Sequence, residues 1–329
     1  MVTIKDVASV AGVSKATVSR IMNGKGASDK TTDRVNKVIA ELGYRPNSLA
    51  KSLSQKDSNL IALLVPNLIN PFFCELAQSI EVEANKRGYQ IYLCNSEDRR
   101  DKVDYFIHNM IDQYVAGAIF SSLHITGEDL ALLESNGIHT ITMDRAQLKH
   151  PYSSLYVNNQ KGGYLATKHL LTMGAKRILM VAGFKENDGS SKGRFLGYTK
   201  ALEEAGITFQ QCIYGEYSMD TGYASVYAYL QKHSPIDAIF CSDDCMAIGA
   251  YRACHALGYV IGKDIKIIGY DNISYCSFCN PPLSSVRQKK SEMSQHIIDE
   301  IDRLHKGTRS IQQYELEPEL VLRASSLGI

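Results

Sequence analysis

The sequence of 329 residues contains no tryptophan, and it lacks the features that identify several classes of protein. No apolar run approaches the roughly 20 residues that a membrane-spanning helix needs. Lys5 and Asp6 interrupt the segment where a signal peptide would have its apolar core, so we expect a cytoplasmic protein. A Gly-rich phosphate loop and a nucleophile elbow are also absent from the sequence, so we expect a protein that is not an enzyme, without catalytic residues.

Eight cysteines are present, and most of them lie among apolar neighbours. In the absence of a secretory signal, such cysteines are expected to be reduced and buried. Cys276 and Cys279, and also Cys241 and Cys245, are spaced like half of a metal site or a redox pair. Neither pair has a partner cluster with ligand spacing, so we predict neither a metal centre nor a cofactor.

Charge is distributed unevenly along the chain, although the formal net charge is only +1. Residues 1–56 hold ten Lys or Arg and four Asp or Glu, which gives +6, and the remaining 26 basic and 31 acidic residues give −5. A basic head on a mildly acidic body indicates that a polyanion binds to the head.

The first 22 residues predict two short helices folded across a tight turn at Gly12. Thr3 and Ser14 are each placed to cap a helix by accepting a bond from a backbone N–H. One face of each helix is apolar, formed by Ile4, Val7, Ala8 and Ala11 in the first and by Val18, Ile21 and Met22 in the second. We predict a third helix, capped by Ser28 and ended by Gly43, with apolar residues at helical spacing.

The opposite face of the second helix carries small, polar or cationic side chains, namely Lys15, Ala16, Thr17, Ser19 and Arg20. A helix that packs by one side and presents such residues on the other is suited to the DNA major groove. An ordinary amphipathic helical hairpin is the alternative interpretation. After a turn at Pro46, residues 48–54 form a segment too short to be a stable helix in water, so it would be helical only when docked.

From Leu60 onward, apolar strands alternate with amphipathic helices, which predicts parallel sheets covered on both faces. Two such sets, joined near residues 157–159, predict two doubly wound subdomains with a cleft between them. Ligands in these folds bind beyond the carboxyl ends of the strands. Those ends carry residues 66–73, 95–98, 121–122, 144–145, 242–244 and 270–272.

These motifs resemble the lactose-repressor (LacI/GalR) family of bacterial transcription regulators over essentially the whole chain. The resemblance is carried by TIKDVA at 3–8, GVS at 12–14, TVSR at 17–20, GYRPN at 43–47, NPFF at 70–73, GRFLGY at 193–198, DCMAIG at 244–249, IGYDN at 268–272 and PPLSSVRQ at 281–288. It implies an all-α helix-turn-helix head and an α/β body of two doubly wound parallel-sheet subdomains, like a type I periplasmic binding protein.

The resemblance also implies domain limits and an oligomeric state. We expect a DNA-binding head over 1–46, a hinge helix and linker over 47–58, and an effector-binding and dimerisation body over 59–329. Within the body, the N-subdomain would take about 59–157 and 288–318, and the C-subdomain about 158–287 and 319–329. Family members are usually dimers on palindromic operators, and the tetramer-forming leucine repeat of some members is absent here, so we expect a homodimer.

The DNA-binding residues implied by the resemblance and by position are Thr3, Ser14, Lys15, Ala16, Thr17, Ser19, Arg20, Asn23, Asn47, Ala50 and Leu53. Lys15 and Ala16 would face base edges, where Lys can donate to guanine and Ala offers a methyl contact. Leu53 would enter the minor groove at the operator centre as an apolar wedge. The alternatives are a solvated Lys15 and a Leu53 that packs against the body.

The effector-binding residues implied in the same way are Phe72, Phe73, Asp144, Arg145, Arg194, Tyr217, Asp243, Asp271 and Gln288. The rings would stack on a sugar, and the charged groups would bind its hydroxyls. The set is most like that of ribose-type repressors, although Asp243 stands where Asn is common, so fructose or another small sugar remains open. The alternatives are core roles for both phenylalanines, a turn-stabilising Asp271 and a hinge role for Gln288.

The function implied is allosteric repression of a carbohydrate-utilisation operon, released by a small sugar with ribose as the first candidate. Two alternatives within the family remain open. One is a catabolite-control regulator whose effector is a phosphorylated carrier protein, and the other is a regulator that depends on a corepressor. A sugar-transport receptor is disfavoured because such proteins carry a secretory signal and have no basic head, and a glycosidase because the clustered carboxylates belong to loops of a binding fold.

Overall fold

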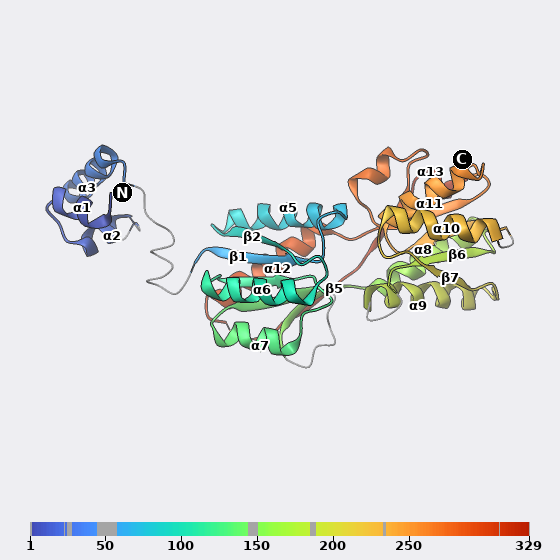
Figure 1. The fold of residues 1–329 in the computed structure, drawn as a ribbon, viewed down its shortest axis with the longest axis horizontal. Coiled ribbons are helices and arrows are strands. Elements are labelled where there is room, and N and C mark those ends of the chain that lie inside the picture. The colour runs from blue at the N-terminus through green and yellow to red at the C-terminus, as the bar shows by residue number, and fades with distance from the viewer. Residues whose placement is uncertain are drawn as a thin grey trace. The chain divides into compact units, whose positions relative to one another are not determined.

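A computed structural model describes residues 2–22, 24, 28–44, 58–143, 151–184, 189–232, 235–308 and 310–328. The chain divides into two compact units, Met1–Ser58 and Asn59–Ile329, which we describe separately (Figure 1). Among the described residues, no helix is both long and apolar enough to cross a membrane.

The first unit contains three helices in its described part, α1 (Ile4–Val10), α2 (Lys15–Met22) and α3 (Asp29–Leu42). Before α1, the backbone N–H and the hydroxyl of Thr3 both donate to the Asp6 carboxylate at 2.8 Å. The Ser14 hydroxyl accepts from the Thr17 N–H at 3.1 Å and so caps α2, as predicted. Ser28 is the N-cap residue of α3, as predicted, but its hydroxyl pairs with the Thr31 hydroxyl and not with a backbone N–H.

A small apolar core joins these helices, and it consists of the side chains that helical spacing had placed on one face. Its buried members are Val7, Ala8, Ala11, Val18, Val35 and Val38. Gly43 ends α3 in the left-handed region, with φ of 59° and its N–H bonded to the Ala40 carbonyl oxygen. Glycine adopts this conformation without a steric penalty, so the sequence signal for the end of the helix was local.

The second unit contains two six-stranded sheets. The first has the order β11-β5-β4-β3-β1-β2 and is parallel throughout. Its strands are β1 (Leu60–Val65), β2 (Gln90–Asn95), β3 (Gly117–Phe120), β4 (His139–Met143), β5 (Ser153–Val157) and β11 (Gln313–Leu316). The helices of this subdomain are α5 (Pro71–Lys86), α6 (Arg100–Asp112), α7 (Gly127–Ser135) and α12 (Lys290–His305).

The second sheet has the order β12-β10-β9-β8-β6-β7, and only β12 runs antiparallel to its neighbour. Its strands are β6 (Ile178–Ala182), β7 (Gln211–Tyr214), β8 (Ala238–Cys241), β9 (Lys266–Asp271), β10 (Ser284–Arg287) and β12 (Glu319–Val321). The accompanying helices are α8 (Asn159–Thr172), α9 (Gly189–Glu204), α10 (Met219–Lys232), α11 (Asp244–Ala256), η1 (Ser274–Phe278) and α13 (Ala324–Leu327).

The chain passes between the two subdomains three times, after β5, after β10 and after β11 (Figure 1). Almost every residue of β1, β3, β6 and β8 is buried, as expected for parallel strands that are covered on both faces. The predicted fold class is confirmed. The crossings bring the carboxyl ends of both sheets to face each other, and this positions the site.

Candidate effector cleft and DNA-binding face

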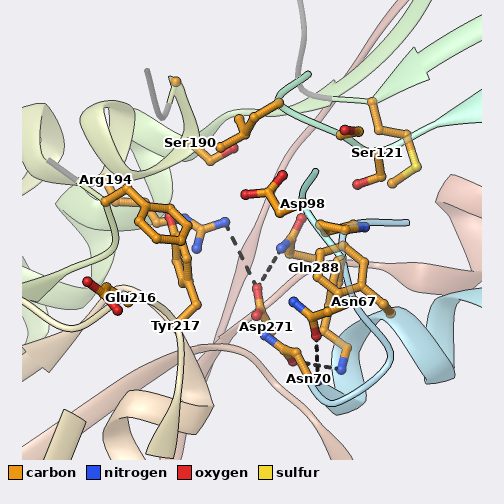
Figure 2. A pocket seen from close by; sticks show the side chains of 18 residues that line it. Asn67, Asn70, Asp98, Ser121, Ser190, Arg194, Glu216, Tyr217, Asp271 and Gln288 are labelled. Carbon is orange, nitrogen blue, oxygen red and sulfur yellow. Dashed lines mark hydrogen bonds and ion pairs between the residues drawn. The ribbon is translucent and has the colours of Figure 1, made fainter. Parts of the chain in front are cut away.

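A cleft lies between the two subdomains and encloses about 980 Å³ of space, part of it open to solvent. Its walls are the loops and helix N-termini that follow the strands (Figure 2). The lining residues are Pro66, Asn67, Asn70, Phe72, Phe73, Asp98, Ser121, Ser122, Leu123, Met143, Phe184, Gly189, Ser190, Arg194, Glu216, Tyr217, Asp271 and Gln288. The cleft therefore lies where ligands of doubly wound sheets bind.

The cleft brings together six of the residues predicted to bind an effector, namely Phe72, Phe73, Arg194, Tyr217, Asp271 and Gln288. Asp144 and Arg145 lie outside the described residues. Asp243 is buried and is not among the residues that line the cleft, so its carboxylate has a different environment from the other predicted residues.

Arg194 is 4% exposed and is held from several sides. Its Nε donates to Asn159 Oδ1 at 2.8 Å, and one terminal nitrogen donates to the Ser242 carbonyl oxygen. The other terminal nitrogen lies 4.0 Å from Asp271 Oδ1 (Figure 2). The guanidinium also stacks on the Tyr270 ring, with 3.7 Å between Cζ and the ring centroid. The fork is therefore oriented before any ligand arrives.

Asp271, the acidic partner of Arg194, is also fixed by hydrogen bonds. Gln288 Nε2 donates to Asp271 Oδ1 at 2.6 Å, and Lys290 Nζ donates to the Asp271 carbonyl oxygen at 3.1 Å. Gln288 Oε1 is buried and has no hydrogen-bond partner within the described part of the chain. A buried acceptor without a partner is costly, and a ligand hydroxyl donating to Oε1 would remove that cost.

Three buried carboxylates interact with one another at the floor of the cleft, that of Asp271, which lines it, and those of Asp243 and Asp244, which do not. Burial, with Asp271 and Asp244 nearby, raises the pKa of Asp243 well above its usual range. Burial, with Asp271 nearby, raises the pKa of Asp244 to about 7. Asp244 still accepts from the Ser285 hydroxyl at 2.7 Å and from the Ile273 N–H at 2.8 Å.

Aromatic rings line both walls of the cleft. Phe72 and Phe73 pack edge to face with their centroids 5.3 Å apart, and Phe184 and Tyr217 do the same at 5.6 Å. Phe72 also belongs to the buried core of its subdomain, so the core interpretation and the cleft interpretation both apply to it. Rings on two sides leave a slot in which a flat apolar face can stack.

Gly183 decides where the Tyr217 ring can lie. A Cβ on Gly183 would stand 2.1 Å from Tyr217 Cζ, which is far inside van der Waals contact. We predict that Gly183→Ala displaces the ring and weakens effector binding about tenfold, while the melting temperature changes little because a side chain can move aside. Titration calorimetry measures the affinity. Leu196→Ala, at an exposed position of α9, is the control and should bind the effector normally. Unchanged affinity in Gly183→Ala would contradict the assignment of Tyr217.

Asp98, Ser121 and Ser122 line the cleft and belong to the strand-end ranges 95–98 and 121–122 where a ligand was predicted, although no individual role was assigned to them. The sequence analysis did not identify Phe184, Ser190 and Glu216, which also line the cleft. Asp98, Glu216, Tyr217 and Asp271 have φ values of 51°, 47°, 56° and 101°, which are uncommon for residues other than glycine. Such conformations concentrate at functional sites, but only the structure reveals them.

The predicted DNA-binding residues that the structure describes are Thr3 before α1, Ser14 before α2 and five residues of α2, and each of them is at least partly accessible. Thr3, Ser14, Lys15, Ala16 and Arg20 are exposed, and Thr17 and Ser19 are half-buried. Val18, on the opposite side of α2, is fully buried. Asn23, Asn47, Ala50 and Leu53 lie outside the described residues. The described residues of this set include cationic and hydroxyl side chains, which suit contacts to phosphates and base edges.

The described residues contain no group of three or more His, Cys, Asp or Glu side chains that could hold a metal ion. All eight cysteines are free thiols, and Cys94, Cys241, Cys245, Cys254 and Cys276 are buried.

Two parts of the chain match known protein families. Residues 3–47 match the family described as bacterial regulatory proteins, lacI family, and residues 167–326 match the periplasmic binding protein-like domain. The chain is 33% identical over 331 aligned residues to the HTH-type transcriptional repressor PurR of Actinobacillus pleuropneumoniae serotype 3, and the alignment covers 99% of this chain and 98% of that protein.

Solved structures agree with these matches. The lac repressor dimer bound to operator and the anti-inducer ONPF superimposes with a TM-score of 0.88 at 28% identity, covering 99% of both chains. A LacI family transcriptional regulator from Enterococcus faecium with bound ribose has a TM-score of 0.74 at 27% identity, covering 82% of this chain and 99% of that chain.

Proposed function

Because this chain belongs to the lacI family of bacterial regulatory proteins, we propose that it represses a carbohydrate-utilisation operon and that a small sugar in the cleft releases it from its operator. The observation that carries the sugar assignment is the convergence of Arg194, Asp271 and Gln288 on the floor of a cleft with aromatic walls. Planar donors and carboxylate acceptors suit neighbouring hydroxyls, and rings suit the apolar face of a sugar.

Ribose is the first sugar to test. The motif set around 70–73, 144–145 and 194 resembles that of ribose-type repressors, and the regulator from Enterococcus faecium was crystallised with ribose. Fructose and other small sugars belong in the same test, because Asp243, which stands where an amide is common, does not line the cleft and so cannot single out ribose.

The mechanism requires only two states with different affinities for the two ligands. A homodimer would hold two heads and two hinge helices in operator register, with the limits 1–46, 47–58 and 59–329 for head, hinge and body. A sugar that binds more tightly to the state unable to hold the operator shifts the population and lowers operator affinity. Such a protein would act in the bacterial cytoplasm, where operator DNA is found.

A thermal-shift panel tests the effector class directly. The full chain has no tryptophan, so the measurement uses an environment-sensitive dye and scans pentoses, hexoses, their phosphates and purines. A ligand at 100 times its dissociation constant stabilises the native state by about 2.7 kcal/mol, which corresponds to a melting-temperature shift of about 5 °C. No shift with any compound would overturn the sugar assignment and favour a phosphorylated protein effector.

An operator titration with and without the sugar shows whether the sugar weakens or strengthens DNA binding. With an operator selected from random-sequence DNA, a gel-shift titration should show weaker binding when the sugar is present. Tighter binding in the presence of the sugar would instead identify a corepressor-dependent regulator.

Leu53 is our proposed minor-groove wedge, and we predict that Leu53→Ala weakens operator binding at least about tenfold without unfolding the body. A smaller side chain cannot unstack the central base step, so the contacts that bending allows are lost. Leu196→Ala, an exposed leucine on α9, is the matched control and should bind the operator normally. Equal operator affinity in both variants would refute the wedge.

A further inference from the structure

Two helix N-caps, one from each subdomain, meet across the cleft. Asn70 Oδ1 accepts from the Phe72 N–H at 3.0 Å and caps α5, while Asp243 Oδ1 accepts from the Met246 N–H at 2.7 Å and caps α11. The remaining ends of the two side chains face each other, since Asn70 Nδ2 donates to Asp243 Oδ2 at 3.1 Å. Asn70 is 7% exposed and Asp243 is 1% exposed, so water competes little for this bond.

The chemistry of this contact requires unlike partners. The only carbonyl oxygen of the Asn70 side chain is used on α5, so the group that it turns toward the other subdomain is a donor. Asp243 has two acceptor oxygens, one for α11 and one for Asn70. An asparagine at 243 that kept its cap on α11 would turn an NH₂ group toward the NH₂ group of Asn70. The carboxylate at 243 therefore matches the amide at 70.

We propose that Asp243 is a positioning residue, which holds Asn70 and the first turn of α5 in place across the cleft so that Phe72 and Phe73 are presented to the effector. Asp243 does not line the cleft, whereas Asn70, labelled in Figure 2, does. We call the hydrogen bond between Asn70 and Asp243 the clasp. The role of the clasp in effector binding rests on the proposed function, but the clasp itself is present in the protein without ligand.

A second contact secures the same end of α5. Glu75, one turn further along the helix, accepts from the Ser274 N–H of the other subdomain at 2.7 Å and pairs with Lys290 at 3.1 Å. Lys290 in turn donates to the carbonyl oxygen of Asp271. The Asn70–Asp243 bond ties the start of α5 to α11, and the Glu75 contacts tie it to the segment that follows Asp271 at the end of β9. Together they link the aromatic wall of the cleft to its polar floor.

Exchanging the polarity of the pair tests the clasp in the full chain without ligand. Asn70→Asp sets one carboxyl group against another and should lower the melting temperature by about 5 °C. In the Asp243→Asn background, where two NH₂ groups would face each other, the same change should raise the melting temperature, because the acceptor at 70 now meets an amide donor at 243. Comparing Asn70→Asp in the two backgrounds removes any effect that Asp243→Asn has through its neighbouring carboxylates.

Asn158→Asp is the matched control, since Asn158 also caps a helix, α8, through the Lys161 N–H. Aspartate is an equally good N-cap, so this variant should melt within about 1 °C of the wild type. Hydrogen exchange gives the cross-cleft readout: exchange of residues 70–76 should rise at least about threefold in Asn70→Asp and return toward the wild-type rate in the double variant.

Equal effects of Asn70→Asp in both backgrounds would overturn the clasp and leave Asp243 as a cap of α11 only. The proposed function fails in a distinguishable way. If D-ribose and every other sugar leave the melting temperature of the wild type unchanged, the effector assignment is wrong, while the comparison of the two backgrounds still decides whether Asp243 positions Asn70.

Discussion

Asp271→Ala is expected to give a folded repressor that binds its operator and no longer responds to the effector. The carboxylate pairs with Arg194, accepts from Gln288 and lines the floor of the cleft. Hydrogen bonds to a charged group contribute about 1.5–3 kcal/mol each, so losing two of them weakens sugar binding at least about 100-fold.

The fold should survive this change for an electrostatic reason. Asp271 is one of three buried carboxylates, and its presence raises the pKa of both Asp243 and Asp244. Removing it relieves that repulsion, which offsets part of the loss of its contacts with Arg194 and Gln288. We therefore expect operator affinity within about threefold of the wild type, since the head does not contain this site.

Calorimetric titration with the sugar identified in the panel measures the loss of binding, and a gel shift with and without that sugar measures the loss of release. Asp220→Asn, at an exposed position on α10, is the control and should respond normally. Normal sugar-dependent release by Asp271→Ala would refute the assignment of the cleft floor.

Asp244→Asn is expected to make the protein more stable at pH 7.5 relative to the wild type, and to have a much smaller effect at pH 5. The folded-state pKa of Asp244 is about 7, whereas an aspartate ordinarily has a pKa of 3.8, so between about pH 4 and pH 7 the folded protein keeps a proton that the unfolded chain has released. Under these conditions the folded state binds more protons, so stability falls as pH rises through this window.

From pH 5 to pH 7.5, the Asp244 carboxyl group alone accounts for a loss of roughly 2 kcal/mol in the free energy of unfolding. Asparagine does not titrate, its oxygen can accept from the Ile273 N–H, and its NH₂ group can donate to the Ser285 hydroxyl. The titratable groups near Asp244 are Asp243, Asp271, Cys241, Cys245, Cys276 and Cys279, and they remain in both proteins.

Urea unfolding of both proteins at pH 5 and pH 7.5 provides the measurement. Other groups, such as His169, whose pKa is lowered by burial, contribute equally to wild type and variant, so they cancel in the difference. A difference between the two proteins that is the same at both pH values would show that Asp244 does not retain a proton in the folded state.

Much of the fold was predictable because its signals are local. Apolar spacing and the glycine at 43 define the three helices of the head, and runs such as 60–65 and 178–182 mark buried parallel strands. The motifs that resemble the lacI family are also contiguous stretches, and the family assignment is confirmed. β5, β7 and β10–β12 were not predicted, because strands of three to five residues carry too little pattern to be distinguished from loops.

The sequence alone determined the family, the two-subdomain α/β body and the edge of the sheets, at the carboxyl ends of the strands, where a ligand would bind. These features depend on the periodicity and order of consecutive residues. Only the tertiary structure decided which strand-end residues converge. It places Asp243 next to Asn70, 173 residues earlier in the chain, and it stacks Arg194 on Tyr270. The first contact joins the two subdomains and the second joins distant segments of one subdomain, and no local pattern encodes either meeting.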